Sequence, residues 1–241
     1  MVACAKQVDL DTLDETQTTE PATIELEPLI DLLGYNRSEV ANFLEEEHVF
    51  EITNAQNASV RFSYPQLIDM EDETTKQRVN EFIFNQFMEV AGEDLDIWHY
   101  FDMNYQVMLS TPKIMSVVFS GSAGGAGGFI RSFTRSVTFD INTLQTLALS
   151  DFVAIDENLA RNLLASDRVF NHVSVVFEDE EMECHLRQMF RVWYEIESLV
   201  EHLEEGHPQF FITQTSLAIL FLDITATASG GGYAWVEVPF E

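Results

Sequence analysis

The chain has 241 residues, of which 46% are apolar and 19 are phenylalanine, so it is long and apolar enough to bury a core. Its 41 acidic residues outnumber 12 Lys and Arg and give a formal net charge of −29. This charge argues against nucleic acid or anionic lipid as a partner, because both would be repelled. A cationic partner and a simply well-solvated surface both remain compatible with it. No apolar run reaches ~18 residues, so no membrane span is predicted.

Residues 1–27 are polar, acidic and rich in threonine, which is typical of a disordered leader or tether. The small residue Ala3 directly before Cys4 resembles the end of a bacterial lipoprotein signal. On that interpretation Cys4 is lipidated, and a lipid anchor is the chain's only expected contact with a membrane. With Cys184 as the second cysteine, the sequence predicts no disulfide framework.

The next segments predict a short helix within 28–47 and β-structure over 49–67, with Pro65 ending the β run. A helix follows, for which Asp72 or Thr74 can provide the N-cap. Its apolar face has helical spacing and consists of Val79, Phe82, Ile83, Phe87 and Val90.

A long β block comes next. Apolar residues alternate strictly from Phe101 to Leu109, and Pro112 marks a break. Strands are then predicted over 114–120 and 129–139. The turn between them is rich in glycine, with five of the chain's eleven glycines between Gly121 and Gly128.

The second half predicts helices over 156–170 and 181–204, the latter ended by Gly206 and Pro208. The apolar stripe of 181–204 is typical of a helix lying on a sheet. Strands are predicted over 210–212, 217–222 and 233–240, and the middle one is apolar on both faces and therefore central.

Strands that follow one another as hairpins, with helices between the sets, predict an α+β fold with antiparallel sheets and helices packed on one face. Two closely associated subdomains are expected after the 1–27 leader. The N-terminal one spans 28–150 and ends in the glycine-rich hairpin, and the C-terminal one spans 151–241.

The glycine-rich hairpin is the main candidate binding region. Residues 111–150 contain one acid and three bases, whereas the rest of the chain contains 40 acids and 9 bases. A nucleotide loop is disfavoured because a strand, not a helix, follows the glycines. A wide turn with positive φ angles and a flexible binding loop both remain.

Arg131 and Arg135 share a strand face with Phe133, because side chains alternate with period two. They can hold a carboxylate or pair with the chain's own acids. At the far end of the chain, Tyr233 and Trp235 are the candidate glycan-stacking residues. The predicted ligand-binding residues are therefore Gly124, Gly125, Arg131, Phe133, Arg135, Tyr233 and Trp235.

Residues 178–185, EDEEMECH, contain metal-binding residue types, with Glu181 and His185 four residues apart. The alternative interpretation is an acidic helix start, where carboxylates favour the positive end of the dipole. No nucleophile, zinc-protease or cysteine–histidine motif is present, so no enzyme activity, metal site or cofactor is predicted. A carboxylate- or metal-dependent envelope hydrolase around 178–185 is the alternative.

Four segments in order resemble one bacterial cell-envelope family. They are Tyr64-Pro65 leading into the TTKQRVNEFIFNQF helix, SGSAGGAGG followed by FDINT and LSDF, FFITQTSLAILF, and GGGYAWVEVPF. The chain is similar to the paired uncharacterised domains found beside the peptidoglycan deacetylase PdaC and in RsiV-type lysozyme-sensing anti-sigma factors. The chain departs from that family at Gly127, where many members have histidine, and at ATASGGG, which lacks the family's Pro-Tyr pair.

The resemblance implies a non-catalytic, extracytoplasmic binding or sensor module of the cell envelope. Its expected target is a basic protein such as lysozyme, or a peptidoglycan fragment. Lysozyme is strongly basic and complements the net charge of −29. The deacetylase domain, a transmembrane helix and a sigma-binding segment are all missing from the chain as given, so we expect the sensor or accessory half alone.

Overall fold

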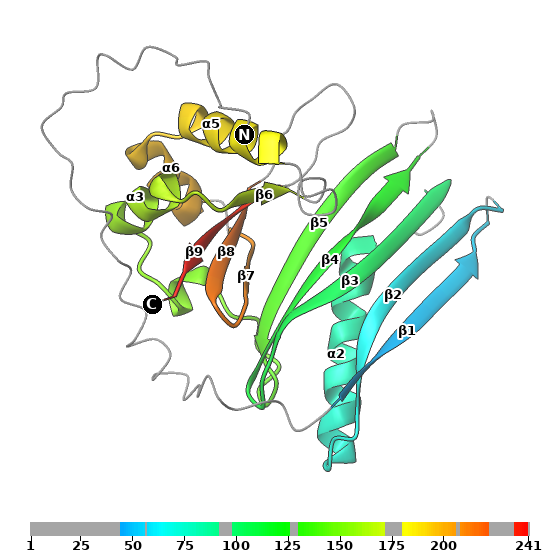
Figure 1. Cartoon of the computed structure of the whole chain (residues 1–241). Coiled ribbons are helices and arrows are strands. Elements are labelled where there is room, and N and C mark those ends of the chain that lie inside the picture. The colour runs from blue at the N-terminus through cyan, green and yellow to red at the C-terminus, as the bar shows by residue number, and fades with distance from the viewer. Residues whose placement is uncertain are drawn as a thin grey trace, which may run out of the picture.

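The computed structural model describes residues 44–55, 57–91, 98–125, 130–171, 180–205, 208–221 and 234–240. They form two sheets, each covered by helix on one face (Figure 1). The predicted α+β class, with antiparallel sheets and helices packed on one face, is confirmed. In spatial order the strands are β1 (Leu44–Thr53), β2 (Ser59–Ile68), β3 (Tyr100–Ser110), β4 (Ile114–Gly124) and β5 (Ile130–Asp140), and in the second sheet β6 (Val169–Asn171), β9 (Ala234–Pro239), β8 (Ser216–Phe221) and β7 (Phe210–Ile212).

One strand pair of the first sheet is parallel. β2 and β3 are aligned only from Val60 to Phe62 against Phe101 to Met103, and every other pair is antiparallel. A parallel pair needs a crossover connection, and α2 (Glu73–Ala91) provides it. The buried face of this helix packs against the sheet to form the first core, centred on seven large apolar side chains: Phe62, Ile83, Phe87, Phe101, Met103, Phe119 and Phe139.

The N-terminal elements differ from the sequence prediction in two places. β1 begins at Leu44, so the end of the predicted 28–47 helix is strand; residues 28–43 lie outside the described part of the chain. Pro65 lies inside β2 and does not end it. Beyond Phe62 the ladder of β2 pairs with β1 alone, and a residue without an N–H is tolerated on such a one-sided stretch.

Two side chains bond main-chain groups around α2, one just before its first residue and one within the helix. Of the two predicted N-cap candidates, Asp72 is the one that caps the helix. Its carboxylate accepts from the Thr74 N–H at 3.0 Å and from the Thr75 hydroxyl at 2.5 Å, and the Thr75 contact lowers the pKa of Asp72. Asn80 accepts from the Leu67 N–H at 2.7 Å and donates to the Leu67 carbonyl at 3.1 Å. Its amide therefore replaces a strand partner on the open side of β2.

The second core lies between the four-stranded sheet and three helices, α3 (Glu157–Ala165), α5 (Glu180–Trp193) and α6 (Ile196–Glu205). The predicted 181–204 helix is thus two helices. The Glu195 N–H donates to the Ser198 hydroxyl at 3.0 Å, a side-chain bond that competes with helix continuation. The predicted 156–170 helix ends at Ala165, because β6 pairs with β9. β8 is central and fully buried, as predicted.

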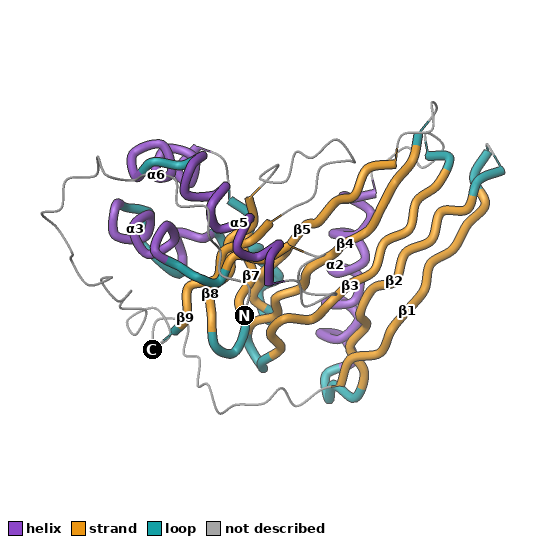
Figure 2. Tube along the Cα trace, turned by 45° about the horizontal axis from the view of Figure 1, so that its top comes forward, coloured by secondary structure: helices purple, strands orange, loops and turns teal. Residues whose placement is uncertain are grey.

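The two sheets are joined by hydroxyl groups as well as by apolar contacts. β7 lies beside β5 in both views (Figures 1 and 2). The buried Ser116 and Thr138 hydroxyls are 2.8 Å apart, and the Ile212 N–H donates to Ser116 at 3.1 Å. Next to them Val118 contacts the cluster that contains Phe211. The layers therefore run from α2 through the two sheets to the three other helices.

Candidate functional site

The hairpin residues predicted to bind a ligand have different environments. Gly124 is buried at the end of β4, and its carbonyl accepts from the His99 N–H at 2.8 Å. Gly125 has open space where a Cβ would lie. Phe133 is half-buried and stacks on Phe101 with ring centroids 5.4 Å apart. Arg135 is exposed. Arg131 belongs to β5, but its side chain is not among those described, and residues 126–129 lie outside the described part of the chain.

The structure does not bring Trp235 together with the hairpin tip. Trp235 is half-buried between Phe170 and Phe211, with centroids 6.0 and 6.1 Å away, and its indole N–H donates to Glu237 at 3.3 Å. It packs at the junction of the sheets, in the same cluster as Val118. Val118 precedes Gly124 by six residues along β4, which is about 20 Å. Tyr233, Cys4 and the side chains of 178–185 lie outside the described residues.

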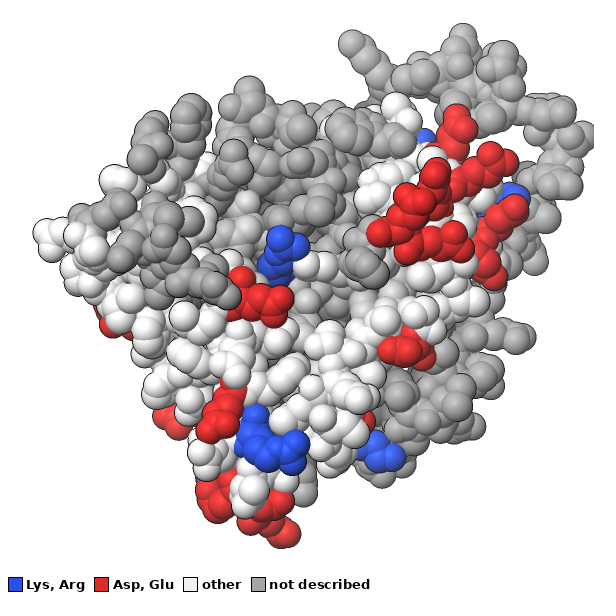
Figure 3. All heavy atoms as spheres, turned by 180° about the vertical axis from the view of Figure 1, so that it is seen from behind, with Lys and Arg blue, Asp and Glu red and all other residues white. Residues whose placement is uncertain are grey.

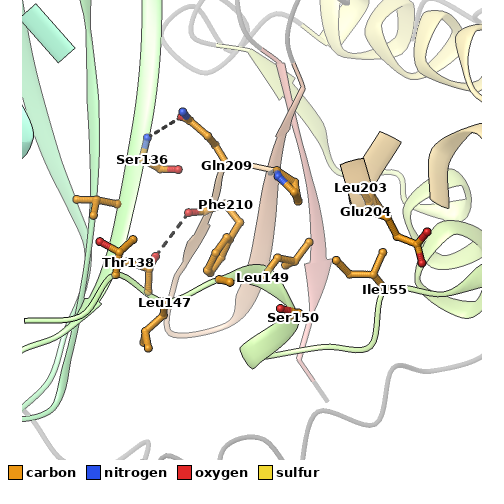
Figure 4. Close-up of a pocket in the computed structure, with 14 residues that line it drawn as sticks. Ser136, Thr138, Leu147, Leu149, Ser150, Ile155, Leu203, Glu204, Gln209 and Phe210 are labelled. Atoms are coloured by element: carbon orange, nitrogen blue, oxygen red, sulfur yellow. Dashed lines mark hydrogen bonds between the residues drawn. The ribbon is translucent and has the colours of Figure 1, made fainter. Parts of the chain in front are cut away.

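A cavity of about 340 Å³ opens where the two sheets meet, a size within the usual range for small-ligand sites (Figure 4). Its wall combines β5, the 146–150 segment, the last turn of α6 and the start of β7. Apolar side chains form much of the lining: Leu147, Leu149, Ile155, Leu203 and Phe210. Sequence analysis did not identify this cavity.

The polar groups of this cavity are mostly committed to holding the sheets together. Gln209 accepts from the Ser136 N–H at 3.1 Å, and Thr138 donates to the Phe210 carbonyl at 3.5 Å (Figure 4). Glu204 differs, because it is exposed and lies at the edge of the cavity, in the last turn of α6 (Figure 4). One negative charge therefore lies at the edge of a largely apolar cavity.

Glu204 also belongs to an acidic surface on α6. Glu197, Glu201 and Glu205 are exposed and spaced four residues apart, so they form one row along the helix, while Leu199 on the other side is buried. Seen from behind, acidic side chains gather over this part of the molecule (Figure 3). Like charges at this spacing destabilise a helix by a few tenths of a kcal/mol per pair, so a cationic partner would relieve the repulsion.

A separate groove lies between α2 and the β1–β2 hairpin. This groove of about 490 Å³ is lined by the aromatic rings of Phe50, Tyr64 and Phe84 and by the amides of Gln66 and Gln77. Gln66 donates to the Tyr64 hydroxyl at 3.3 Å, and burial raises the pKa of Tyr64. Aromatic rings flanked by amides are the residue types that a sugar-binding groove requires.

The described part of the chain contains no group of three His, Cys, Asp or Glu side chains that could hold a metal ion. The His202 ring stacks on the Phe221 ring with centroids 6.0 Å apart, and its centroid is 5.5 Å from that of Tyr194, so His202 has a packing role. No helix among the described residues has the length and apolarity needed to cross a membrane.

The acidic row on α6, the cavity between the sheets and the aromatic groove differ in how far the sequence predicts them. The four-residue spacing of Glu197, Glu201 and Glu205 is visible in the sequence and predicts an acidic helix row. The cavity lining comes from segments around 136–155 and 203–210, and the groove lining from 50–84. Their proximity depends on the packing of the two sheets and of α2, for which the sequence has no local pattern.

Neither a protein-family model nor a curated protein matches this chain. The chain is similar to a solved structure of a DUF3298 family member from Bacteroides fragilis, with 11% identity, a TM-score of 0.46, and coverage of 83% of this chain and 92% of that one. It is also similar to a DUF3298 family protein from Pseudomonas aeruginosa, with 9% identity, a TM-score of 0.40, and coverage of 85% and 93%. These likenesses do not confirm the resemblance to the PdaC and RsiV domains.

Proposed function

We propose that the chain is a non-catalytic binding module for a basic protein, such as lysozyme, at the bacterial cell envelope. One observation carries the proposal: Glu204 belongs both to the acidic surface of α6 and to the cavity between the sheets. A basic partner could therefore contact the row of carboxylates and insert one Lys or Arg side chain beside Glu204. The net charge of −29 adds long-range attraction.

The cellular location is part of the same proposal. A module that binds lysozyme has to lie outside the cytoplasm, where that protein is met. Lipidation of Cys4 would keep the module at the membrane surface and leave the acidic surface of α6 free to bind. Sequencing of the gene's 5′ end tests this part, since a lipoprotein signal ahead of Cys4 is expected.

The binding test is calorimetric titration with a c-type lysozyme at about 0.02 M and about 0.3 M NaCl. We expect micromolar or tighter binding that weakens as salt rises. Replacing Glu197, Glu201 and Glu205 by glutamine should weaken binding about tenfold, since three exposed charge pairs at about 0.5 kcal/mol each contribute about 1.5 kcal/mol together.

The matched control replaces Glu46, Glu47 and Glu71 by glutamine. These acids are exposed on β1 and before α2, so both triple variants change the net charge by three. The control should retain nearly the full affinity. Equal losses in the two variants would show that total charge alone matters, and an absence of heat at low salt would refute the proposal.

Peptidoglycan fragments are the second candidate ligand, favoured by the aromatic groove of Phe50, Tyr64 and Phe84. The same titration with a muropeptide provides the test. If glycan binds there, Gln77→Ala should abolish the muropeptide heat, because Gln77 is an exposed amide of the groove, while the α6 triple variant should retain it. Heat that survives Gln77→Ala would move the site away from the groove.

A further inference from the structure

A second cavity, of about 310 Å³, lies where α2, β5 and the start of β7 meet. Two opposite charges line it: Arg135 from β5 and Glu89 from α2, both exposed. Six other Lys and Arg side chains of the described chain pair with a carboxylate within 4.0 Å. Arg135 belongs to none of these pairs, although Glu89 faces the same cavity.

One uncharged donor in the same cavity is also available. The Oε1 atom of Gln209 accepts from the Ser136 N–H at 3.1 Å. Because a backbone N–H can only donate, this contact identifies the oxygen of the amide and leaves its NH₂ group to donate elsewhere. The Ser136 side chain lies on the opposite face of β5 from Arg135 and Val137, because side chains alternate along a strand, so its hydroxyl is not part of this site. Phe119 and Val137 complete the lining with apolar surface.

The combination of charges selects the ligand class. A simple anion would be attracted by Arg135 but repelled by Glu89 and by a net charge of −29. A simple cation would satisfy Glu89 and leave Arg135 without a partner. A molecule that carries both charges satisfies both side chains and, having no net charge, is not repelled by the molecule as a whole.

We propose that this cavity binds a free α-amino acid in its zwitterionic form. The carboxylate is held by the Arg135 guanidinium, which suits bidentate contact, and the ammonium is held by Glu89. The Gln209 NH₂ group completes the polar contacts. The apolar lining receives the amino-acid side chain. This site shares Ser136, Val137 and Gln209 with the cavity between the sheets, but its charged groups, Arg135 and Glu89, line only this site, so the inference does not depend on the proposed function.

Alanine and its two half-molecules provide a sharp test, because propionate lacks the ammonium and ethylamine lacks the carboxylate. Binding of L-alanine, D-alanine, L-leucine and L-glutamine is measured by calorimetry at up to about 10 mM, the range in which weak contacts of this kind are detected. We expect at least one amino acid to bind, and we expect propionate and ethylamine to bind at least about tenfold more weakly than alanine.

Variants locate the site. Arg135→Gln and Glu89→Gln should each weaken amino-acid binding by about tenfold or more, whereas Arg161→Gln, an exposed arginine on α3, should leave it unchanged within about twofold. No binding by any of the four amino acids, equal binding of propionate, or equal effects of Arg161→Gln and Arg135→Gln would each overturn the proposal.

Discussion

Gly121 shows how a single residue of the glycine-rich hairpin is used for packing and not for binding. A Cβ at this position would lie 2.1 Å from the Asp102 carbonyl oxygen and 2.8 Å from the Met103 Cα, both main-chain atoms. The rings of Phe101 on β3 and Phe133 on β5 stack at 5.4 Å from either side of β4. Without a side chain at Gly121, these aromatic residues can meet across the intervening strand.

We expect Gly121→Ala to lower the free energy of unfolding by about 2 kcal/mol or more, because the main chain of β3 cannot move away alone. Urea denaturation measures the change. Gly125→Ala is the matched control, since nothing lies within 4 Å of its added Cβ, and its effect should stay within about 0.5 kcal/mol. Similar losses for the two variants would contradict the close-approach argument.

At the scale of the elements, side chains replace missing strand partners. β2 loses β3 as a neighbour beyond Phe62, and the Asn80 amide takes over both main-chain groups of Leu67. β5 is the edge strand of its sheet, and Gln209 accepts from its Ser136 N–H. Losing either contact would leave main-chain N–H or C=O groups of the first sheet without a partner, which costs folding free energy. The two contacts therefore help to hold α2 and β7 against that sheet.

Asn80→Ala should destabilise the fold by about 1–3 kcal/mol, the usual range for leaving a buried polar group without its partner. Asn85→Ala, on an exposed position of the same helix, matches the change in helix propensity and should shift stability by less than about 0.5 kcal/mol.

Hydrogen exchange gives a second, local readout of the Asn80 contact. The Leu67 amide should lose protection in Asn80→Ala and retain it in Asn85→Ala, because only Asn80 accepts from that N–H. Unchanged protection of Leu67 in Asn80→Ala would show that the contact is unimportant in solution.

At the scale of the whole molecule, the charge is far from balanced. Forty-one acids face 12 Lys and Arg, and α6 adds a row of like charges at four-residue spacing. Mutual repulsion destabilises a compact state of high net charge, and dissolved salt screens that repulsion. The stability of this fold should therefore depend on ionic strength.

We expect the melting temperature to rise between about 0.02 M and about 0.5 M NaCl, as screening weakens the repulsion. The variant with glutamine at 197, 201 and 205 carries three fewer negative charges, so its rise should be smaller. Scanning calorimetry measures both. A melting temperature that falls with salt would mean that the ion pairs of the chain outweigh its repulsion.

Much of the element pattern was predictable from sequence, because alternation and helical spacing are local. The β3–β5 block, the apolar face of α2 and the central position of β8 follow from such patterns. The 28–47 helix prediction was wrong at its end, because Leu44–Thr53 pairs with β2 along its whole length. The break in the helix after Trp193 was also missed. The apolar stripe continues across it, and the break is marked only by the contact between the Glu195 N–H and the Ser198 hydroxyl.

By itself the sequence determined the acidic charge, the α+β class and the order of most elements, since each depends on composition or on neighbouring residues. Only the tertiary structure decided which distant residues meet. Gln209 reaches Ser136 across 73 residues, and Glu204 meets the 146–150 segment in one cavity. Such contacts depend on how two sheets pack, and packing is set by the summed burial of many side chains rather than by any local pattern.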